Sequence, residues 1–438
     1  MLNKAKINFF IIAALIAFYG CQPAVIAPSP PLQEPAVKLS PRQELKNMGI
    51  KYNPGSFLNA VENGDAKLVE IFIAAGMNPD AKNRIASTAL IIASDRGHLE
   101  TVKTLVYRKA DVNYQNAYGQ SALILAAKKG YAEILEFLLV NGADVHLKDR
   151  TGATALAQAV TEGHEESMLL LIKWNSDIRA VDNQGASIFQ RAVERGWVNI
   201  IGYFLDREFD VNAANKNGYT LLMDASAEGR YELVKLLIEK GADINATDTL
   251  DNTPLLEAAE RNHPDTLKLL IEKGAEIKAQ NDQGRTALMK AAKKDGFKNI
   301  NALLDAGADI NVQDKRGRTA LVYAARLNNL NSLALLLKRG AAVDVQSVNG
   351  WTALTFASFK GHYEAVRMLI DNGADINARD NSNMTALMYG AISGEPKAVE
   401  ILLSAGADKD AVDKKGNTAL KYAEKKGIPE LVQLLQGR

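Results

Sequence analysis

Several features that would point to catalysis or to covalent cross-links are missing from this sequence. Its 438 residues include one cysteine, Cys21, so an intrachain disulfide and a cysteine-based zinc site are both excluded. Neither a GxxxxGK(S/T) phosphate-binding loop nor a GxSxG nucleophile turn occurs in the chain. The sequence therefore predicts a protein that is not an enzyme and that uses no metal ion or cofactor.

An excess of charge of one sign and long apolar runs are also lacking. The 52 lysine and arginine residues are nearly matched by 51 aspartate and glutamate residues. A general nucleic-acid-binding protein has a strongly basic domain, so we expect no nucleic acid partner. The apolar run near the N-terminus, from about residue 7 to residue 19, is shorter than the ~20 residues that a transmembrane helix needs. Aromatic residues make up only 6% of the chain.

The N-terminal segment has the pattern of an export signal. Lys4 and Lys6 precede the apolar run, which is typical of a secretory signal peptide. The run ends in Phe18-Tyr19-Gly20-Cys21, which resembles a bacterial lipobox, although Phe18 stands where leucine is usual. The resemblance implies cleavage before Cys21 and attachment of lipid, including palmitate, to that residue. An ordinary cleaved signal with an incidental cysteine, or an uncleaved anchor, are the alternatives.

The leader and the residues after it divide the chain into four expected parts. Residues 1–20 are the signal peptide, and residues 21–41 are the lipidated cysteine and a tether. Six of the twelve prolines lie between Pro23 and Pro41, which favours an extended, semi-rigid spacer. Residues 42–54 form a lead-in, and residues 55–436 form a repeat array. We expect a lipid-anchored protein of the bacterial cell envelope. Gln22 favours the periplasmic side of the outer membrane over the inner membrane.

A threonine or serine marks a phrase that recurs every 33 residues without insertion. The marker residues are Thr88, Ser121, Thr154, Ser187, Thr220, Thr253, Thr286, Thr319, Thr352, Thr385 and Thr418. They define units 2 to 12, and a degenerate unit 1 begins near Gly55. The marker hydroxyl suits the cap of a first helix, and the small residue five positions later lets two helices approach closely. A glycine then ends that helix in most units, and a second helix runs to a Gly-Ala-Asp turn.

This pattern closely resembles the ankyrin repeat family over nearly the whole chain after the tether. The resemblance implies an all-α solenoid of about twelve 33-residue helix-turn-helix units with β-hairpin fingers. Units 4 and 5 depart from the pattern, because residues 174–177 and 207–210 break the Gly-Ala-Asp turn and Ser187-Ile188-Phe189 replaces Thr-Ala-Leu. A local bend, a partner site and simple drift all remain open for these two units.

Four of the five histidines occupy one slot of the repeat, so they are predicted to be structural and to bind no metal. The fifth, His146, replaces the asparagine of a unit-end turn. The four in the common slot are His98, His164, His263 and His362.

The resemblance places partner contacts on the finger tips and on the inner face of the first helices. That stripe becomes basic, with aromatic residues interleaved, between about residues 285 and 360. Arginine and tryptophan are enriched at binding hot spots, so we expect the stripe to bind a protein with an acidic surface. A solvated positive rim is the plainer alternative. The candidate partner-binding residues are Arg285, Lys293, Lys294, Lys315, Arg316, Arg318, Arg326, Trp351, Phe359 and Lys360.

The function expected from all of these features is a monomeric, envelope-anchored module that binds one protein partner. Two other functions would use the same surface. One is an immunity protein that neutralises a toxin or lipase acting in the periplasm. The other is a secreted effector that binds host proteins.

Overall fold

The computed structural model describes residues 39–207 and 209–437, which form helices joined by short turns. The predicted signal peptide and Cys21 lie outside the described residues, as does nearly all of the predicted tether. Within the described ranges there are 25 α-helices and no β-strand. None of these helices is long and apolar enough to span a bilayer.

After α1 (Pro41–Asn47), the helices form twelve pairs, one pair for each predicted unit. We call the first member of each pair the inner helix and the second member the outer helix. The inner helices are α2 (Pro54–Glu62), α4 (Ala89–Arg96), α6 (Ala122–Lys129), α8 (Ala155–Glu162), α10 (Ile188–Arg195), α12 (Leu221–Ala227), α14 (Pro254–Arg261), α16 (Ala287–Lys293), α18 (Ala320–Leu327), α20 (Ala353–Lys360), α22 (Ala386–Ser393) and α24 (Ala419–Lys426). The outer helices are α3 (Ala66–Ala74), α5 (Leu99–Tyr107), α7 (Ala132–Val140), α9 (Glu165–Lys173), α11 (Val198–Leu205), α13 (Tyr231–Glu239), α15 (Pro264–Glu272), α17 (Phe297–Asp305), α19 (Leu330–Lys338), α21 (Tyr363–Asp371), α23 (Pro396–Ser404) and α25 (Pro429–Gln436).

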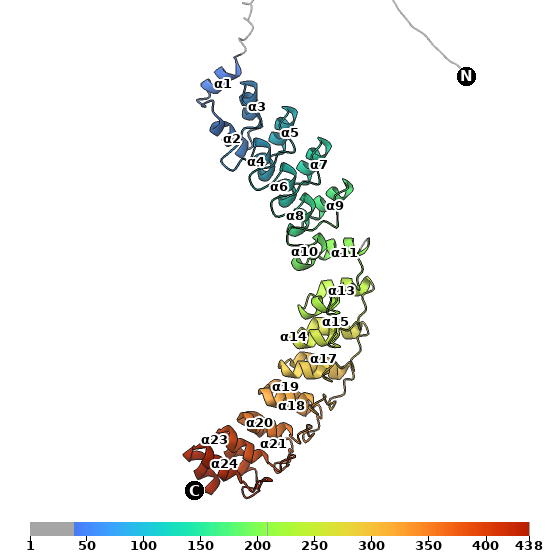
Figure 1. The fold of residues 1–438 in the computed structure, drawn as a ribbon, viewed down its shortest axis with the longest axis vertical. Coiled ribbons are helices and arrows are strands. Elements are labelled where there is room, and N and C mark those ends of the chain that lie inside the picture. Colours follow the sequence, from blue (N-terminus) through green and yellow to red (C-terminus); the bar gives the residue numbers. More distant parts are fainter. Residues whose placement is uncertain (1–38, 208, 438) are drawn as a thin grey trace, which may run out of the picture.

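The pairs stack into a long curved array (Figure 1). In its N-terminal half, the inner helices α4, α6, α8 and α10 lie on the concave side and the outer helices lie on the convex side. Each unit packs mainly on its immediate neighbours in the sequence. The structure and the family match reported below thus confirm the predicted all-α ankyrin-type solenoid.

The ends of the inner helices are formed by the residues that the repeat pattern indicated. The marker hydroxyl accepts a hydrogen bond from the amide three residues later, as from Val322 to Thr319 at 3.4 Å and from Ile124 to Ser121 at 3.3 Å. This bond satisfies one of the amides that a helix N-terminus leaves without a partner. At the other end, Gly130 takes the left-handed conformation that lets the chain leave the helix, with φ of 76°.

The core is one continuous apolar cluster that runs through the described part of the array. The small residue five positions after the marker is fully buried in unit after unit, as at Ala93, Ala126 and Ala159. At the N-terminal end, Leu45 of α1 is buried against the first pair, and Tyr52 stacks on Phe72. No unit closes its own apolar face, so stability comes from unit interfaces.

The fingers between units are tight turns and not strand-bearing hairpins. An aspartate or asparagine closes each of these turns except one, where Ser347 takes this place. For example, Asp314 Oδ1 accepts the amides of Arg316 at 2.8 Å and Arg318 at 2.9 Å. Among the described fingers, single antiparallel bridges form at Lys82–Thr88, Lys148–Thr154, Val181–Ser187 and Ala214–Thr220. The helix begins at once after the marker, so the finger arms are too short to pair further.

The histidine slot is a tie between neighbouring units. The Nε2 atoms of His98, His164 and His362 lie 2.9, 3.1 and 3.2 Å from backbone carbonyls of Glu62, Lys128 and Arg326, near the end of the preceding inner helix. Each imidazole therefore bonds one of the carbonyls that a helix C-terminus leaves unsatisfied.

Replacing Gly130 by alanine should destabilise the array more than replacing Gly142. Both glycines have positive φ, so either alanine carries left-handed strain of about 1 kcal/mol. A Cβ on Gly130 would also lie 2.5 Å from Nδ1 of His164, whereas a Cβ on Gly142 would meet nothing within 4 Å. The displaced imidazole would lose its bond to the carbonyl of Lys128, adding about 1–3 kcal/mol. Urea unfolding followed by circular dichroism measures the difference; equal midpoint shifts for Gly130→Ala and Gly142→Ala would contradict it.

Candidate functional site

The candidate residues come from three consecutive units, whose inner helices are α16, α18 and α20. These helices pack directly on one another, so equivalent residues line up across the units. On each inner helix, the residues four, seven and eight positions after the marker share one face, because they are about one turn apart. The finger residue just before the marker lies next to that face. The candidate surface is therefore one strip across units 8 to 10, not a closed cavity.

Lys293 and Lys294 face a carboxylate of the preceding unit. Glu260 Oε1 lies 2.8 Å from Nζ of Lys293 and 3.9 Å from Nζ of Lys294. A third lysine, the buried Lys290, places its Nζ 3.8 Å from Oε2 of the same glutamate. Part of the positive charge expected from this stretch is thus neutralised within the protein.

Burial perturbs the charged groups next to this cluster. Desolvation lowers the pKa of Lys290, although the nearby Glu257 and Glu260 oppose the shift. Desolvation likewise raises the pKa of Glu257, and Lys290 opposes that shift. The cluster is therefore a set of mutually compensating charges in α14 and α16.

Arg318 and Arg285 belong to a second network, built around Asp314. The guanidinium of Arg318 donates from Nε at 3.0 Å and from Nη2 at 2.8 Å to Oδ2 of Asp314. The hydroxyl of Tyr323 donates to the same oxygen at 2.7 Å and accepts from Nε of Arg285 at 2.9 Å. Arg318 is only 7% exposed, so its guanidinium holds the finger against the inner helix and offers little surface to a partner.

The bonds in this network set the charge state of Asp314. Its burial alone would raise the pKa, but hydrogen bonds from the amide and guanidinium of Arg318 and from Tyr323 outweigh burial and lower the pKa. Burial and the bond to Asp314 raise the pKa of Tyr323. The aspartate therefore stays ionised and the tyrosine stays neutral.

Trp351 and Phe359 lie together in an aromatic cluster on units 10 and 11. The ring of Trp351 lies 4.9 Å from that of Phe356, 5.3 Å from that of Phe359 and 4.4 Å from that of Tyr389. Asp380 Oδ2 fixes two members of the cluster, because it accepts hydrogen bonds from Nε1 of Trp351 at 3.0 Å and from the Tyr389 hydroxyl at 2.7 Å. Phe359 is 36% exposed and Trp351 is partly buried, so the cluster presents a fixed apolar surface.

Four of the predicted cations lie on units 9 and 10, on the same strip as this aromatic cluster, without a compensating carboxylate. Lys315, Arg316 and Lys360 are exposed, and Arg326 is half-buried at the end of α18. Of the described carboxylates, none lies within ion-pair distance of these four side chains. The ammonium of Lys360 lies 5.6 Å above the ring of Phe359. We call these four residues the exposed cations.

The residue four positions after the marker was missed by the sequence reasoning. In units 9 to 12 it is aromatic, and three of the four residues donate a hydroxyl to a finger aspartate. The signal was present, because this position precedes the seventh and eighth positions by one helical turn and shares their face. The four residues are Tyr323, Phe356, Tyr389 and Tyr422.

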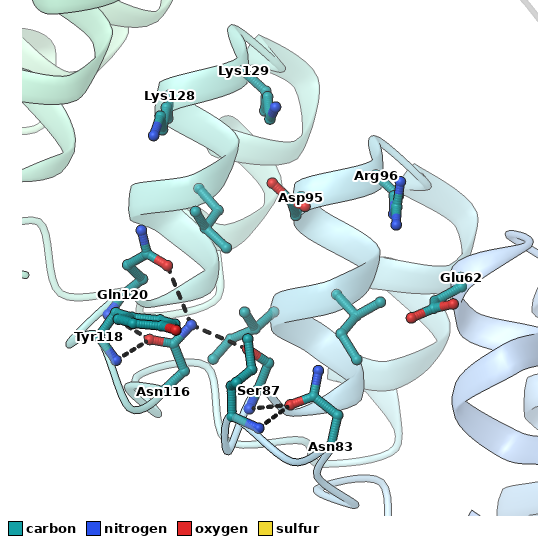
Figure 2. Close-up of a pocket in the computed structure, with 14 residues that line it drawn as sticks. Glu62, Asn83, Ser87, Asp95, Arg96, Asn116, Tyr118, Gln120, Lys128 and Lys129 are labelled. Atoms are coloured by element: carbon teal, nitrogen blue, oxygen red, sulfur yellow. Dashed lines mark hydrogen bonds between the residues drawn. The ribbon is translucent and has the colours of Figure 1, made fainter. Parts of the chain in front are cut away.

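A polar pocket of about 370 Å³ lies on the same side of the array, in units 1 to 3. Figure 2 shows Asn83, Ser87, Asn116, Tyr118 and Gln120 of two fingers facing the ends of the neighbouring inner helices. Asn116 Nδ2 donates to Ser87 Oγ at 3.1 Å and ties the two fingers together. The helix ends contribute Glu62, Asp95, Arg96, Lys128 and Lys129. Basic residues at this pocket are thus mixed with acidic ones and lack an aromatic cluster like that of units 10 and 11.

The described part of the chain contains no group of three or more histidine, cysteine, aspartate or glutamate side chains placed to hold a metal ion.

Comparisons with known proteins identify the repeat. A family model described as ankyrin repeats in three copies matches residues 57–149, 156–248, 247–314 and 297–380, and one described as ankyrin repeats in many copies matches residues 359–403. Among solved structures, the chain is similar to the crystal structure of the ankyrin repeat domain of Bcl-3, described as a unique member of the IkappaB protein family. That similarity has 28% identity and a TM-score of 0.45, and it covers 51% of this chain and 100% of the other. A search of curated proteins returned no match.

Replacing Arg318 by methionine should destabilise the protein, whereas replacing Arg316 should not. Arg318→Met leaves a buried carboxylate without its cation, at a cost of about 3 kcal/mol, while the exposed Arg316 has no such partner. The pKa of Asp314 is lowered by folding, so its contribution is present above its usual value near 3.8 and is lost as the pH falls through the folded value. Urea unfolding at pH 7 and at lower pH measures this. A difference between the two variants that does not shrink in acid would show that the ion pair is not its source.

Proposed function

This chain belongs to the ankyrin repeat family, and we propose that it is a non-enzymatic binding module held at the bacterial cell envelope by a lipid on Cys21. Ankyrin repeat arrays are protein-interaction modules, and the family models that match the chain describe ankyrin repeats. Our proposal adds a site, a kind of partner and a location to that general role. The partner is a protein with an acidic surface that binds across units 9 to 11.

One observation carries the choice of site: the exposed cations share one strip of units 9 and 10 with a rigid aromatic cluster, and Lys360 lies against its Phe359 ring. Trp351 and Phe359 are fixed by ring contacts and by Asp380, so they lose little side-chain entropy when a partner covers them. Arginine and aromatic anchors of this kind dominate the energy of many interfaces. Uncompensated charge at the rim attracts an acidic partner and accelerates its association.

Internal ion pairs favour some of the candidate residues over others as partner contacts. Lys293 and Lys294 already face Glu260, and Arg318 is buried with Asp314, so a partner would have to compete with internal carboxylates for them. Lys315, Arg316, Arg326 and Lys360 have no such competitor. The proposed contacts are therefore these four cations with Trp351, Phe359 and the edge of Tyr389.

The proposed anchor rests on the sequence of the first 41 residues. A proline-rich segment rises about 3.1 Å per residue when extended, so residues 21–41 would reach up to about 60 Å from a membrane surface. That length would leave the side of the array free for a partner in the same compartment. The placement of the chain's one cysteine directly after the apolar run supports this arrangement.

Reversing the exposed cations should abolish partner capture from an envelope extract. The bait is the full mature chain, and the variant carries Lys315→Glu, Arg316→Glu, Arg326→Glu and Lys360→Glu. A matched control carries Arg96→Glu, Lys128→Glu and Lys129→Glu at the pocket of Figure 2. We expect one acidic protein to bind the wild type and the control, to be lost from the variant, and to bind more weakly as salt is raised.

Two other results would contradict this site. A partner that binds the reversed variant and the wild type equally does not use the exposed cations. A partner lost only from the control binds at the other pocket. If the captured protein kills cells that lack this chain, the immunity role replaces that of a general binding module. If only host extracts yield a partner, the effector role does.

The Cys21→Ser variant should lose both lipid and membrane association. Bacteria that express the chain are fed an alkyne-labelled palmitate, and the protein is purified and tested for the label. We expect the wild type to be labelled and to sediment with membranes, and Cys21→Ser to be unlabelled and released. An unlabelled wild type would disprove the lipid anchor while leaving the partner site to be judged by the capture experiment.

A further inference from the structure

The stack is interrupted between units 5 and 6. In the described ranges, α10 and α12 are the only neighbouring inner helices that do not pack closely, whereas each other consecutive pair from α2 to α24 does. Figure 1 shows this place as the separation between the parts that carry α10 and α11 above and α13 and α14 below. The outer helices α11 and α13 remain in contact across it.

The fingers show the same interruption independently. At every other junction from unit 2 onward, a backbone amide of one finger donates to a carbonyl of the finger before it, as from Asn183 to Thr151 and from Thr249 to Asn217, both at 2.9 Å. The corresponding bond, from the amide of Lys216 to the carbonyl of Gln184, is not formed, although both residues are described. The finger layer is therefore discontinuous where the inner helices are.

The exposed side chains match an array end. The residue three positions after the marker is buried in most units. It is exposed in two units: Gln190 in unit 5 and Lys421 in unit 12, the last unit of the array. On helix α12, which faces α10, the residue directly after the marker is Leu221, and it is half-buried. In units 2 to 5 and 7 to 12, the alanine, isoleucine or proline at that position is buried. Helix α10 thus presents the kind of face that closes a stack.

Aromatic residues of unit 5 offer a physical reason for the interruption between units 5 and 6. Phe189 stands in the slot of a buried leucine, and Phe209 stands in the slot of the Gly-Ala-Asp alanine. Their rings stack at 4.5 Å with an angle of 15°, and Phe204 meets Phe209 edge-on at 5.5 Å. All three rings belong to unit 5, so these side chains pack on one another within the unit.

Contacts made by the outer helix α13 and its two cap residues hold units 5 and 6 together. The ammonium of Lys240 pairs with the carboxylate of Asp206, and the guanidinium of Arg230 donates to the carbonyl of Val193. Gly202 of α11 faces Leu236 of α13, where a Cβ would lie 3.5 Å from the leucine methyl groups. These links join units 5 and 6 through α13, and the bond from Arg230 reaches the end of the inner helix α10, while the inner faces of α10 and α12 stay apart.

We propose that the junction between units 5 and 6 is a hinge. The outer helices α11 and α13 are its pivot, and the inner helices α10 and α12 separate or approach on the concave side. In a repeat array, each interface contributes separately to stability, so a weak interface permits motion without loosening the units on either side. The hinge lies between the polar pocket of units 1 to 3 and the exposed cations of units 9 to 11, so its motion changes the distance between these two surfaces.

Distances between spin labels in the full chain test the hinge directly. Labels at Thr151→Cys and Asn217→Cys span two junctions, one of which is the proposed hinge, in a Cys21→Ser background. Labels at Asn217→Cys and Gln283→Cys span two regular junctions with the same 66-residue separation and serve as the control. We expect the distance distribution of the first pair to be at least about twofold wider, because domain hinges sample a range of angles. Equal widths would overturn the proposal.

A repaired junction provides the second arm of the test. The changes Phe189→Leu, Gln190→Met, Phe209→Ala and Leu221→Ala restore the residue types of the regular units. We expect them to narrow the first distribution to the width of the control, with helicity unchanged. If a folded repair variant keeps the wide distribution, the assignment of the hinge to these contacts is overturned. If the variant fails to fold, the comparison of the two wild-type distributions still decides the matter.

Discussion

The structure depends on one constraint: a 33-residue helix pair cannot bury its own apolar face. Alanines such as Ala126 and Ala159 are fully buried, and their inner helices pack on those of the next units. The repeat therefore selects small residues at the contact between units and leaves the finger and one face of the inner helix free to vary. The exposed cations of the candidate surface lie at these variable positions. The small buried residues lie at the positions where one unit meets the next.

The finger aspartates connect these two sets of positions. Asp314, Asp380 and Asp413 each use Oδ1 to accept amides within the finger turn. Each uses Oδ2 to accept a tyrosine hydroxyl from the inner helix, at 2.6–2.7 Å. Burial would raise the pKa of Asp413, as it would for Asp314, but the hydrogen bonds outweigh burial and lower the pKa, so these two carboxylates remain charged and keep their donors. The inner-face tyrosines are thus fixed by the same groups that form the turns, which makes the aromatic surface a rigid part of the fold.

The sequence predicted the period, the caps, the helix pairs and the structural use of the histidines, because each depends on residue type at a fixed place within a unit. It did not predict which cations would be free. Lys293 meets Glu260, which is 33 residues earlier, and that meeting depends on how neighbouring units lie side by side. Arg318 has a carboxylate four residues earlier, but its burial depends on Tyr323 and the packing of the finger. The repeat period predicts on which face of the array a residue lies. Which residues of neighbouring units form ion pairs can be read only from the three-dimensional structure.

In units 4 and 5, residues 174–177 and 207–210 depart from the Gly-Ala-Asp turn of the other units. The two departures have different effects on the packing between units. Asn175 takes the left-handed conformation of the usual glycine with φ of 62°, and the inner helix of unit 4 still packs on that of unit 5, although their outer helices α9 and α11 do not pack closely. Unit 5 combines its altered turn with two added aromatic rings, and only there does the inner layer separate. A broken turn motif alone therefore leaves the inner layer intact, because asparagine tolerates positive φ. The inner layer separates where the irregular unit also carries Phe189 and Phe209, whose rings stack on each other within unit 5.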